Sequence, residues 1–232
     1  MNQTEFIEAL KQFNLELNKN QLQMLEKYCD LLIEYNEKTN LTAIKEKPDI
    51  YLKHFYDSLT IQKHIQKDDS VLDIGTGAGF PGMVLAIARP DLKITLLDSN
   101  NKKIQFLQFL KDELKIENVT LVHDRAEDFA KNHLETFDVV TSRAVAQLRV
   151  LCELSIPMLK INGCFIAMKG ILDTEFDEAI NTIRVLNSVV SKRDQFYLPI
   201  ENSKRENLII LKKESCSAIY PRKYDKIIKN SL

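Results

Sequence analysis

The chain has 232 residues, of which 44% are hydrophobic and 28% charged, as in an ordinary soluble globular protein. No uninterrupted apolar run approaches the roughly 20 residues that span a bilayer, and the first residues lack the apolar core of a signal peptide, so we expect a cytoplasmic protein without a membrane segment. The net charge of −1 excludes a uniformly basic protein, although residues 192–232 hold ten Lys/Arg and five Asp/Glu, which suits either a polyanion-binding face or a solvated surface.

Residues 1–65 are predicted to be mainly helical. They contain no glycine and one proline, Pro48. Leu22, Leu25, Leu32 and Tyr35 recur at the three-to-four spacing of an amphipathic helix. We therefore expect an N-terminal helical extension over residues 1–65, with its aliphatic stripe packed on a core.

The pattern changes at Ser70, after which short β-type runs alternate with helical stretches; the runs are 71–74, 93–98, 119–123, 137–142 and 163–168. Ser99 is a plausible N-cap for the helix after the second run, and another helix is expected around 173–190. Residues 196–200 and 207–213 could add an antiparallel pair of strands at the edge. Residues 66–232 are therefore predicted to form an α/β domain with a doubly wound, mostly parallel, seven-stranded Rossmann-like sheet.

Four of the six glycines lie in the segment DIGTGAGFPG (73–82), between a predicted strand and a predicted helix: Gly75, Gly77, Gly79 and Gly82. At this turn of a doubly wound sheet, backbone N–H groups meet a ligand. The GxGxxG pattern that begins at Gly77 suggests a dinucleotide, but Asp73 stands two residues before Gly75. A carboxylate there would repel a pyrophosphate by about 1 kcal/mol per close contact and suits a cofactor with a cationic amino-acid end. The sequence therefore favours S-adenosyl-L-methionine over NAD.

Three later positions complete the predicted cofactor site. Asp98 ends the second strand, where a carboxylate can accept hydrogen bonds from both ribose hydroxyls of either cofactor. Ala126 and Glu127 follow the third strand, where an adenine edge could be read, although Glu127 could equally cap a helix. Arg143 ends the fourth strand and could hold the acceptor, its phosphate or the cofactor carboxylate, or form only a structural salt bridge.

Missing motifs narrow the chemistry. The segment TSRAVAQL (141–148) lacks the double proline typical of enzymes that methylate exocyclic amino groups, and no cysteine stands beside a proline, as it does in pyrimidine carbon-5 methyltransferases. The cysteines and histidines have no metal-ligand spacing, so we expect no metal site. What remains is in-line attack by an atom that is already nucleophilic, such as ring nitrogen 7 of guanine. Catalysis would then rest on positioning and electrostatics, with Arg143 as the catalytic candidate.

Several segments resemble the bacterial glucose-inhibited division protein B family, the 7-methylguanosine methyltransferases of small-subunit ribosomal RNA. They occur in the family's order along most of the chain: YNEKTNLTAI (35–44), KHFYDSL (53–59), DIGTGAGFPG (73–82), LLDS (96–99), RAED (125–128), SRAVAQL (142–148) and YPRK (220–223). The last segment of the chain, from Tyr220, lacks the proline-rich ending expected of the family.

The resemblance implies a class I methyltransferase fold and transfer of a methyl group to nitrogen 7 of one guanine in 16S ribosomal RNA of the small subunit. It places the cofactor at Gly75, Phe80, Ala126, Glu127 and Arg143. These residues join Asp73, Gly77 and Asp98, which the glycine loop and the strand ends already predict as cofactor residues. It also makes Lys169, Arg222 and Lys223 candidates for contact with RNA. We expect a monomer that acts on a whole or partly assembled small subunit.

Three alternatives stay open at this point. A small-molecule methyltransferase would use the same cofactor loop on another acceptor. An NAD-dependent oxidoreductase is what the GxGxxG pattern alone would favour. A non-catalytic RNA-binding module would use the basic C-terminal region without turnover.

Overall fold

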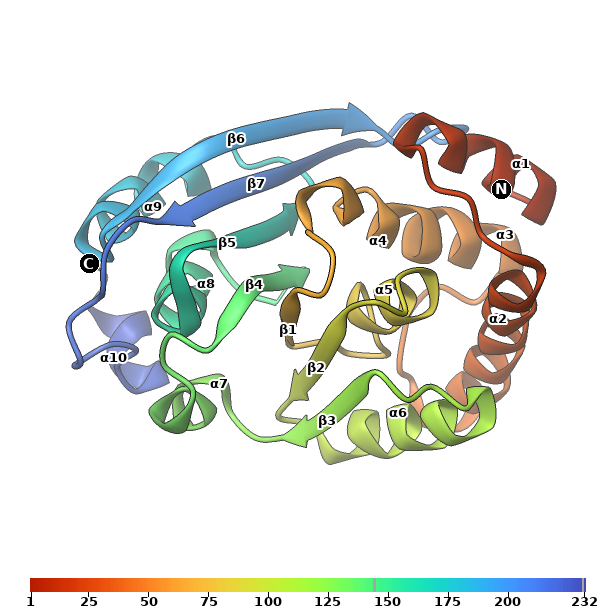
Figure 1. Cartoon of the computed structure of the whole chain (residues 1–232), viewed down its shortest axis with the longest axis horizontal. Coiled ribbons are helices and arrows are strands. Elements are labelled where there is room, and N and C mark those ends of the chain that lie inside the picture. Colours follow the sequence, from red (N-terminus) through yellow and green to blue (C-terminus); the bar gives the residue numbers. More distant parts are fainter. Residues whose placement is uncertain (144, 231) are drawn as a thin grey trace.

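A computed structural model describes residues 1–143, 145–230 and 232; residue 144, in the SRAVAQL segment, and residue 231, near the C-terminus, lie outside the described residues. A single seven-stranded sheet runs through the molecule in the order β3-β2-β1-β4-β5-β7-β6 (Figure 1). The strands are β1 (Ser70–Ile74), β2 (Lys93–Asp98), β3 (Val119–His123), β4 (Phe137–Arg143), β5 (Leu159–Lys169), β6 (Ser188–Tyr197) and β7 (Lys204–Lys212).

Strands β1 to β5 pair in parallel, whereas β7 is antiparallel to both β5 and β6. This confirms the predicted α/β sheet and its antiparallel edge pair. The edge strand β6 begins at Ser188 rather than at residue 196, and the preceding helix ends at Val185 rather than near 190. The polar stretch within β6 hid the strand, because edge strands tolerate exposed charged residues that read as a loop in sequence.

Helices cover both faces of the sheet (Figure 1). On one face, α5 (Gly82–Ala88) and α6 (Asn101–Leu114) pack on β1 to β3, and α2 (Lys19–Thr39) packs on both helices. On the other face lie α8 (Leu148–Ser155) and α9 (Asp173–Val185), with α10 (Tyr224–Lys229) against α8. The remaining helical segments are α1 (Gln3–Leu10), η1 (Lys11–Phe13), α3 (Lys47–Ile50), η2 (Tyr51–Tyr56), α4 (Asp57–Leu59), η3 (Gln62–His64), α7 (Ala126–Phe129), η4 (Ala130–Asn132) and η5 (Ile156–Met158).

Alternation along the strands divides the core between the two faces. In β1, Val71 joins the hydrophobic cluster under α2, α5 and α6, while Leu72 joins the cluster under α8 and α9. Successive side chains of a strand point to opposite faces, so a parallel sheet with helices on both sides reads as a nearly continuous apolar run. This explains why VLDI could be recognised as a strand from sequence.

The N-cap of α6 is Asn100, not Ser99 as predicted. The Asn100 backbone is extended, and its side-chain oxygen accepts a hydrogen bond from the Lys102 N–H at 3.0 Å. Asparagine and serine are both good N-caps, so a choice between adjacent residues depends on backbone geometry that local sequence does not fix.

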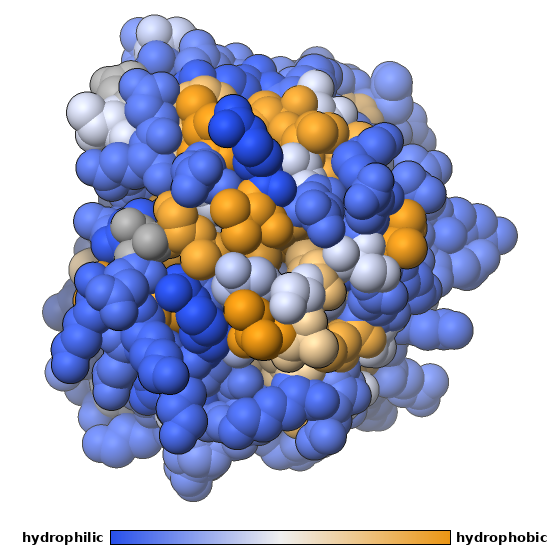
Figure 2. Space-filling view, turned by 90° about the vertical axis from the view of Figure 1, so that its left-hand side faces the viewer, coloured by the Kyte–Doolittle hydropathy of each residue, from blue (hydrophilic) through white to orange (hydrophobic). Residues whose placement is uncertain are grey.

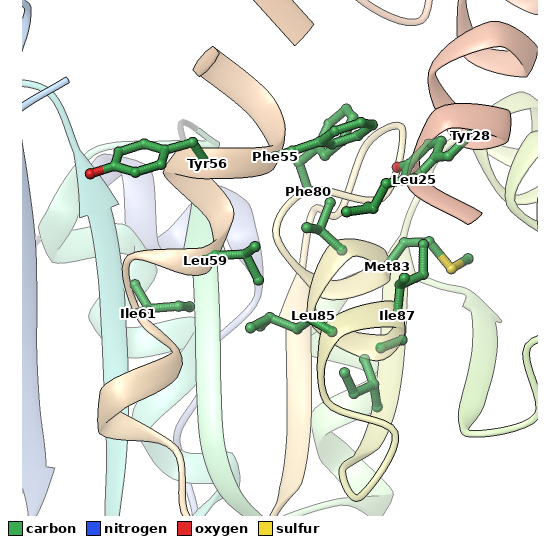
Figure 3. Close-up of a cluster of buried hydrophobic side chains, with 14 of the residues drawn as sticks. Leu25, Tyr28, Phe55, Tyr56, Leu59, Ile61, Phe80, Met83, Leu85 and Ile87 are labelled. Atoms are coloured by element: carbon green, nitrogen blue, oxygen red, sulfur yellow. The ribbon is translucent and has the colours of Figure 1, made fainter. Parts of the chain in front are cut away.

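The N-terminal segment is helical, as predicted, and packs directly on the glycine-rich turn. Figure 3 shows Tyr28 of α2 and Phe55 of η2 lying beside Phe80, with Leu59 of α4 and Leu85 of α5 below them. Tyr28 stacks on Phe80 with ring centroids 5.5 Å apart. Because one hydrophobic cluster contains residues of both regions, we propose that the division at residues 65 and 66 marks a change of secondary structure rather than two units that fold alone.

The surface over α8, α9 and α10 mixes hydrophobic and hydrophilic side chains. Figure 2 views the molecule from this side and shows hydrophobic residues gathered near the middle, interrupted by hydrophilic ones. Exposed hydrophobic residues of these helices include Ile180, Val185 and Ile228. In the described part of the chain, no helix has the length and apolar character needed to cross a membrane.

Candidate functional site

A cavity of about 570 Å³ opens at the carboxyl ends of β1, β2 and β4. Ligand sites of open α/β sheets lie at this edge, where the strand order reverses. The cavity brings together most of the cofactor residues predicted from sequence: Gly75, Gly77, Phe80, Asp98, Ala126, Glu127 and Arg143.

The glycine loop, residues 75–81, exposes its backbone to this cavity. Gly75 and Gly77 have φ angles of +68° and +62°, in the left-handed region that other residues rarely adopt. A Cβ atom on Gly75 would stand 2.5 Å from Cγ2 of Val145, whereas the nearest atom to a Cβ on Gly77 would be the Gly75 carbonyl oxygen at 4.0 Å. The space beside Gly77 therefore belongs to the cavity, and a ligand can approach the main chain there.

Asp98 joins the glycine loop to the start of α6. One carboxylate oxygen accepts the Gly77 N–H at 2.9 Å, and the other accepts the Asn100 N–H at 2.9 Å. Lys103 lies 3.6 Å away as a charge partner. The carboxylate is thus fixed at the cavity wall with its negative charge facing the ligand space.

Asp73 lies behind the loop rather than on the cavity wall. Its Oδ2 accepts hydrogen bonds from the Thr76 hydroxyl at 2.6 Å and from the Gly82 N–H at 2.9 Å. Its Oδ1 is buried and has no hydrogen-bond partner among the described residues. Burial raises the pKa of Asp73 to about 6.

Glu127 is the last acidic residue of the predicted set. It lies in the first turn of α7, and its carboxylate accepts a hydrogen bond from Arg125 at 2.8 Å. With Ala126 it forms the cavity wall next to Asp98. This position is compatible with both roles expected for Glu127, which are contact with a ligand and a negative charge at a helix N-terminus.

Tyr28 lies in the helical region whose stripe was predicted to pack on a core, and its contact with the glycine loop was not predicted. Tyr28 is fully buried, and its hydroxyl donates a hydrogen bond to the Ala78 carbonyl at 2.5 Å. A tyrosine within an aliphatic helical stripe was the available clue, since a buried hydroxyl needs a partner. The N-terminal region therefore holds the glycine loop from outside the sheet.

We expect Tyr28→Phe to lower the free energy of unfolding by about 1 kcal/mol, because one buried hydrogen bond is lost without a change in packing. The looser loop should also weaken cofactor binding. Chemical denaturation and calorimetric titration with S-adenosylmethionine measure the two effects. Tyr35→Phe, on the same helix, is the matched control, and equal effects of both substitutions would contradict a specific role for Tyr28.

Arg143 lies where the cavity meets the N-terminal region. Its Nη1 donates to the Lys53 carbonyl at 2.8 Å and to Asp57 at 3.2 Å, and its Nη2 donates to Nδ1 of His54 at 2.9 Å. The guanidinium also lies 5.1 Å from the centre of the Phe80 ring, close enough for a cation–π contact. Arg143 thus forms a structural ion pair with Asp57 and also lines the cavity.

His54 stays neutral in this arrangement. Burial and the charge of Arg143 lower its pKa to about 3. Because Nδ1 accepts from Arg143, the ring proton is on Nε2, which lies 3.0 Å from the Thr42 hydroxyl. The ring stacks on Phe80 with centroids 4.1 Å apart. Both ring nitrogens are occupied, so His54 positions its neighbours and is unsuited to accept a proton from a substrate.

Thr42, His54 and Asp57 were not among the predicted site residues. They belong to the segments YNEKTNLTAI and KHFYDSL, which were noted only for family resemblance. Residues 51–56 form a π-helical stretch between α3 and α4, a feature that often accompanies functional sites.

A second, smaller cavity of about 340 Å³ adjoins the first, and both are lined by His54 and Arg143. Its other lining residues are Ile44, Lys53, Asp57, Met168, Lys169, Gly170, Arg205 and Asn207. Burial raises the pKa of Asp57, and the guanidinium groups of Arg143 and Arg205 oppose that rise. These two permanent cations favour the ionised form of the carboxyl.

The three RNA-facing candidates are in different settings. Lys169 lines the second cavity, and its ammonium group donates to the Ala146 carbonyl and to Glu175. Arg222 makes a two-pronged pair with buried Glu153, at 2.7 and 2.6 Å. Lys223 is exposed just before α10. The structure therefore brings Lys169 close to Arg143 but leaves Arg222 and Lys223 outside both cavities.

The family model described as rRNA small subunit methyltransferase G matches residues 21–207. A protein of Exiguobacterium sibiricum named ribosomal RNA small subunit methyltransferase G is 45% identical, with 96% of each chain covered. A Bacillus velezensis protein of the same name is 46% identical, with 96% of this chain and 95% of the relative covered. The chain belongs to this family.

Family membership confirms the resemblance found in the sequence and the methyltransferase class. The oxidoreductase alternative has no support from these relatives. Among solved structures, the precorrin-6y C5,15-methyltransferase of Geobacter metallireducens is similar with a TM-score of 0.53, at 18% identity, with 75% of this chain and 92% of that chain covered. At this identity the similarity confirms the fold class alone, that of an S-adenosylmethionine-dependent methyltransferase.

Proposed function

We propose that the protein transfers a methyl group from S-adenosyl-L-methionine to ring nitrogen 7 of one guanine in 16S ribosomal RNA of the small subunit. The observation that carries this proposal is the joining of two cavities at Arg143 and His54 in a chain of the methyltransferase G family. One cavity has the features of a cofactor site, and the other opens beside it toward an acceptor.

The residues of the first cavity fit S-adenosylmethionine. Gly75 and Gly77 offer open backbone, Asp98 offers a fixed carboxylate for the ribose hydroxyls, and Ala126 and Glu127 lie where an adenine edge would be read. The unpartnered Oδ1 of Asp73 leaves a negative charge near the loop, which favours a cationic ligand over a pyrophosphate. Phe80 and Arg143 close the side that faces the second cavity.

Bound S-adenosylmethionine would supply an electrophilic methyl carbon, which the lone pair of nitrogen 7 would take as the carbon–sulfur bond electrons stay on sulfur and the positive charge passes to the purine. Nitrogen 7 has no proton to remove, so the site requires no general base. This agrees with the state of His54, which is neutral, has both ring nitrogens engaged and is therefore not available as a base. Arg143 and its partners fix the two ligands relative to each other.

We assign RNA contact to the basic groups beside the second cavity and to Lys223. Lys169 faces that cavity, and Lys223 is solvent-exposed. The pairing of Arg222 with Glu153 suggests that Arg222 orders the segment before α10 and so supports Lys223. We further propose that the protein acts in the cytoplasm as a monomer on small subunits rather than on free RNA, because few basic side chains alone give little specificity.

A methyl-transfer assay tests the function. Purified protein with labelled S-adenosylmethionine should label small subunits from cells that lack the gene, and should not label subunits from cells that carry it. Labelling of a metabolite with no labelling of the subunits would establish the small-molecule alternative instead.

The charge of Asp73 gives a pH prediction. Protonation at the free Oδ1 would remove the charge while leaving both hydrogen bonds to Oδ2. With a pKa of about 6, affinity for the cationic cofactor should rise by up to about tenfold from pH 5 to pH 7. Isothermal titration of the wild type and of Asp73→Asn with S-adenosylmethionine at several pH values measures this change. In Asp73→Asn the affinity should depend much less on pH.

The free energy of unfolding should change in the opposite direction to cofactor affinity and fall as the pH rises. The unfolded carboxyl loses its proton near pH 3.9, before the folded one, so the Asp73 contribution to the free energy of unfolding should fall by about 2 kcal/mol between pH 4 and pH 6. The difference between wild type and Asp73→Asn isolates this contribution. An identical pH dependence in both proteins would contradict the assignment.

A further inference from the structure

The second cavity contains a buried carboxylate that the cofactor site does not use. Asp57 is 5% exposed and begins α4, at the boundary with the π-helical stretch. Its Oδ2 accepts the hydrogen bond from Arg143. Its Oδ1 accepts no hydrogen bond from the described residues, and Nε of Arg205 lies 3.8 Å from it, beyond hydrogen-bond distance.

We propose that the second cavity holds the guanine base that is methylated, and that Asp57 reads its N1–H and 2-amino donors. This inference rests on the proposed function. A carboxylate is an acceptor-only group, and guanine is the RNA base that presents two adjacent donors on one edge. Nitrogen 7, on the other side of the base, would then lie at the boundary of the two cavities, which His54 and Arg143 line, where it can meet the methyl carbon directly.

The rest of the cavity suits a flat base. Ile44 and Met168 add apolar surface. The volume of about 340 Å³ lies at the small end of the range for ligand pockets, about 300–1,000 Å³. A phosphate group is the other ligand that the neighbouring cations could attract, but a negatively charged Asp57 in the same cavity disfavours it. Lys53 and Arg205, both partly exposed, are placed to meet the backbone phosphates outside the base.

Asp57 would also favour the reaction itself. Methylation at nitrogen 7 gives the purine ring a positive charge and makes N1–H a stronger donor. The attraction to the carboxylate therefore grows as the transition state forms, which is the kind of interaction that raises kcat rather than only binding.

The test needs a substrate that differs by one amino group. Once the methylated nucleotide is mapped, small-subunit RNA is ligated with guanosine or inosine at that position and assembled with ribosomal proteins. Inosine keeps nitrogen 7 and N1–H but lacks the 2-amino group. Methyl transfer rates are measured for the wild type, for Asp57→Asn, and for Asp30→Asn, which changes an exposed aspartate outside both cavities.

The wild type and Asp30→Asn should methylate guanosine subunits about tenfold or more faster than inosine subunits, since a hydrogen bond to a charged group is lost. Asp57→Asn should lower kcat and reduce this ratio, because the amide has one acceptor oxygen and no negative charge. Equal wild-type rates on both substrates overturn the proposal even if Asp57→Asn does not fold. An unchanged ratio in Asp57→Asn overturns it too, as does tighter RNA binding by that variant, which a phosphate pocket would give. If the wild type methylates neither substrate, the proposed function itself fails.

Discussion

Arg143→Ala is expected to lower kcat/KM for methyl transfer to small subunits by about 10² to 10³, the range typical for removal of one preorganised electrostatic group. The guanidinium holds the Lys53 carbonyl, His54 and Asp57 at the boundary of the two cavities. Without the guanidinium, the methyl donor and the acceptor are no longer held in a fixed position relative to each other. Steady-state kinetics with purified subunits measures the effect.

Two further substitutions separate catalysis from folding. Arg143→Ala leaves Asp57 without its closest cation, which can cost about 3–5 kcal/mol of stability. Arg143→Lys keeps the charge but presents its donors from one nitrogen instead of a planar fork, so it cannot reproduce contacts made by both Nη1 and Nη2. It should fold normally and still be slow. Arg149→Ala, which removes an arginine of α8 that donates to the Ile227 carbonyl, is the matched control and should retain activity.

RNA binding distinguishes the enzyme from a binding module. Subunit affinity should stay nearly unchanged in Arg143→Lys, because Arg143 is 16% exposed and most of its donors are engaged within the protein. A loss of affinity equal to the loss of turnover would contradict a catalytic role.

Asp98→Ala should weaken binding of S-adenosylmethionine by about 100-fold or more. The substitution removes the proposed ribose contacts and also leaves the Gly77 and Asn100 N–H groups without their acceptor, and each charged hydrogen bond contributes about 1.5–3 kcal/mol. Asp98→Asn keeps the size but can accept only one of these two bonds, so it should be intermediate. Isothermal titration calorimetry measures both variants.

Asp112→Ala is the control for Asp98. Asp112 lies on α6, the helix that Asp98 precedes, and its side chain accepts a hydrogen bond from Gln108 at the surface. Its substitution should leave cofactor affinity unchanged. Comparable losses in the Asp98 and Asp112 variants would show that general loosening of this region, rather than the ribose contact, accounts for the effect.

The grouping of most predicted cofactor residues in one cavity could be anticipated from sequence because its determinants are local. Strand-ending carboxylates, closely spaced glycines and the periodicity of the flanking strands all lie within short segments, and the parallel sheet necessarily brings strand ends to one edge. For this reason the sequence alone singles out Asp98 and Gly77, and the structure places both on the wall of the first cavity.

The second cavity, which we propose for the acceptor, depends on contacts between distant segments. Arg143 meets His54 across 89 residues, and on the cofactor side Tyr28 likewise reaches Ala78 of the glycine loop across 50 residues. No periodicity encodes such pairs, so His54, Asp57 and Tyr28 read as parts of an ordinary helical extension. Asp73 was assigned to the correct turn, but its place behind the loop follows from hydrogen bonds to Thr76 and Gly82 that spacing alone does not reveal.

The most direct test of the account is a map of 7-methylguanosine in 16S ribosomal RNA by reductive strand cleavage. Cells with the gene, without it, and complemented with Arg143→Lys should be compared. We expect one cleavage site that disappears without the gene and is restored by the wild type but only weakly by the variant. An unchanged cleavage pattern in cells without the gene would contradict the proposed function.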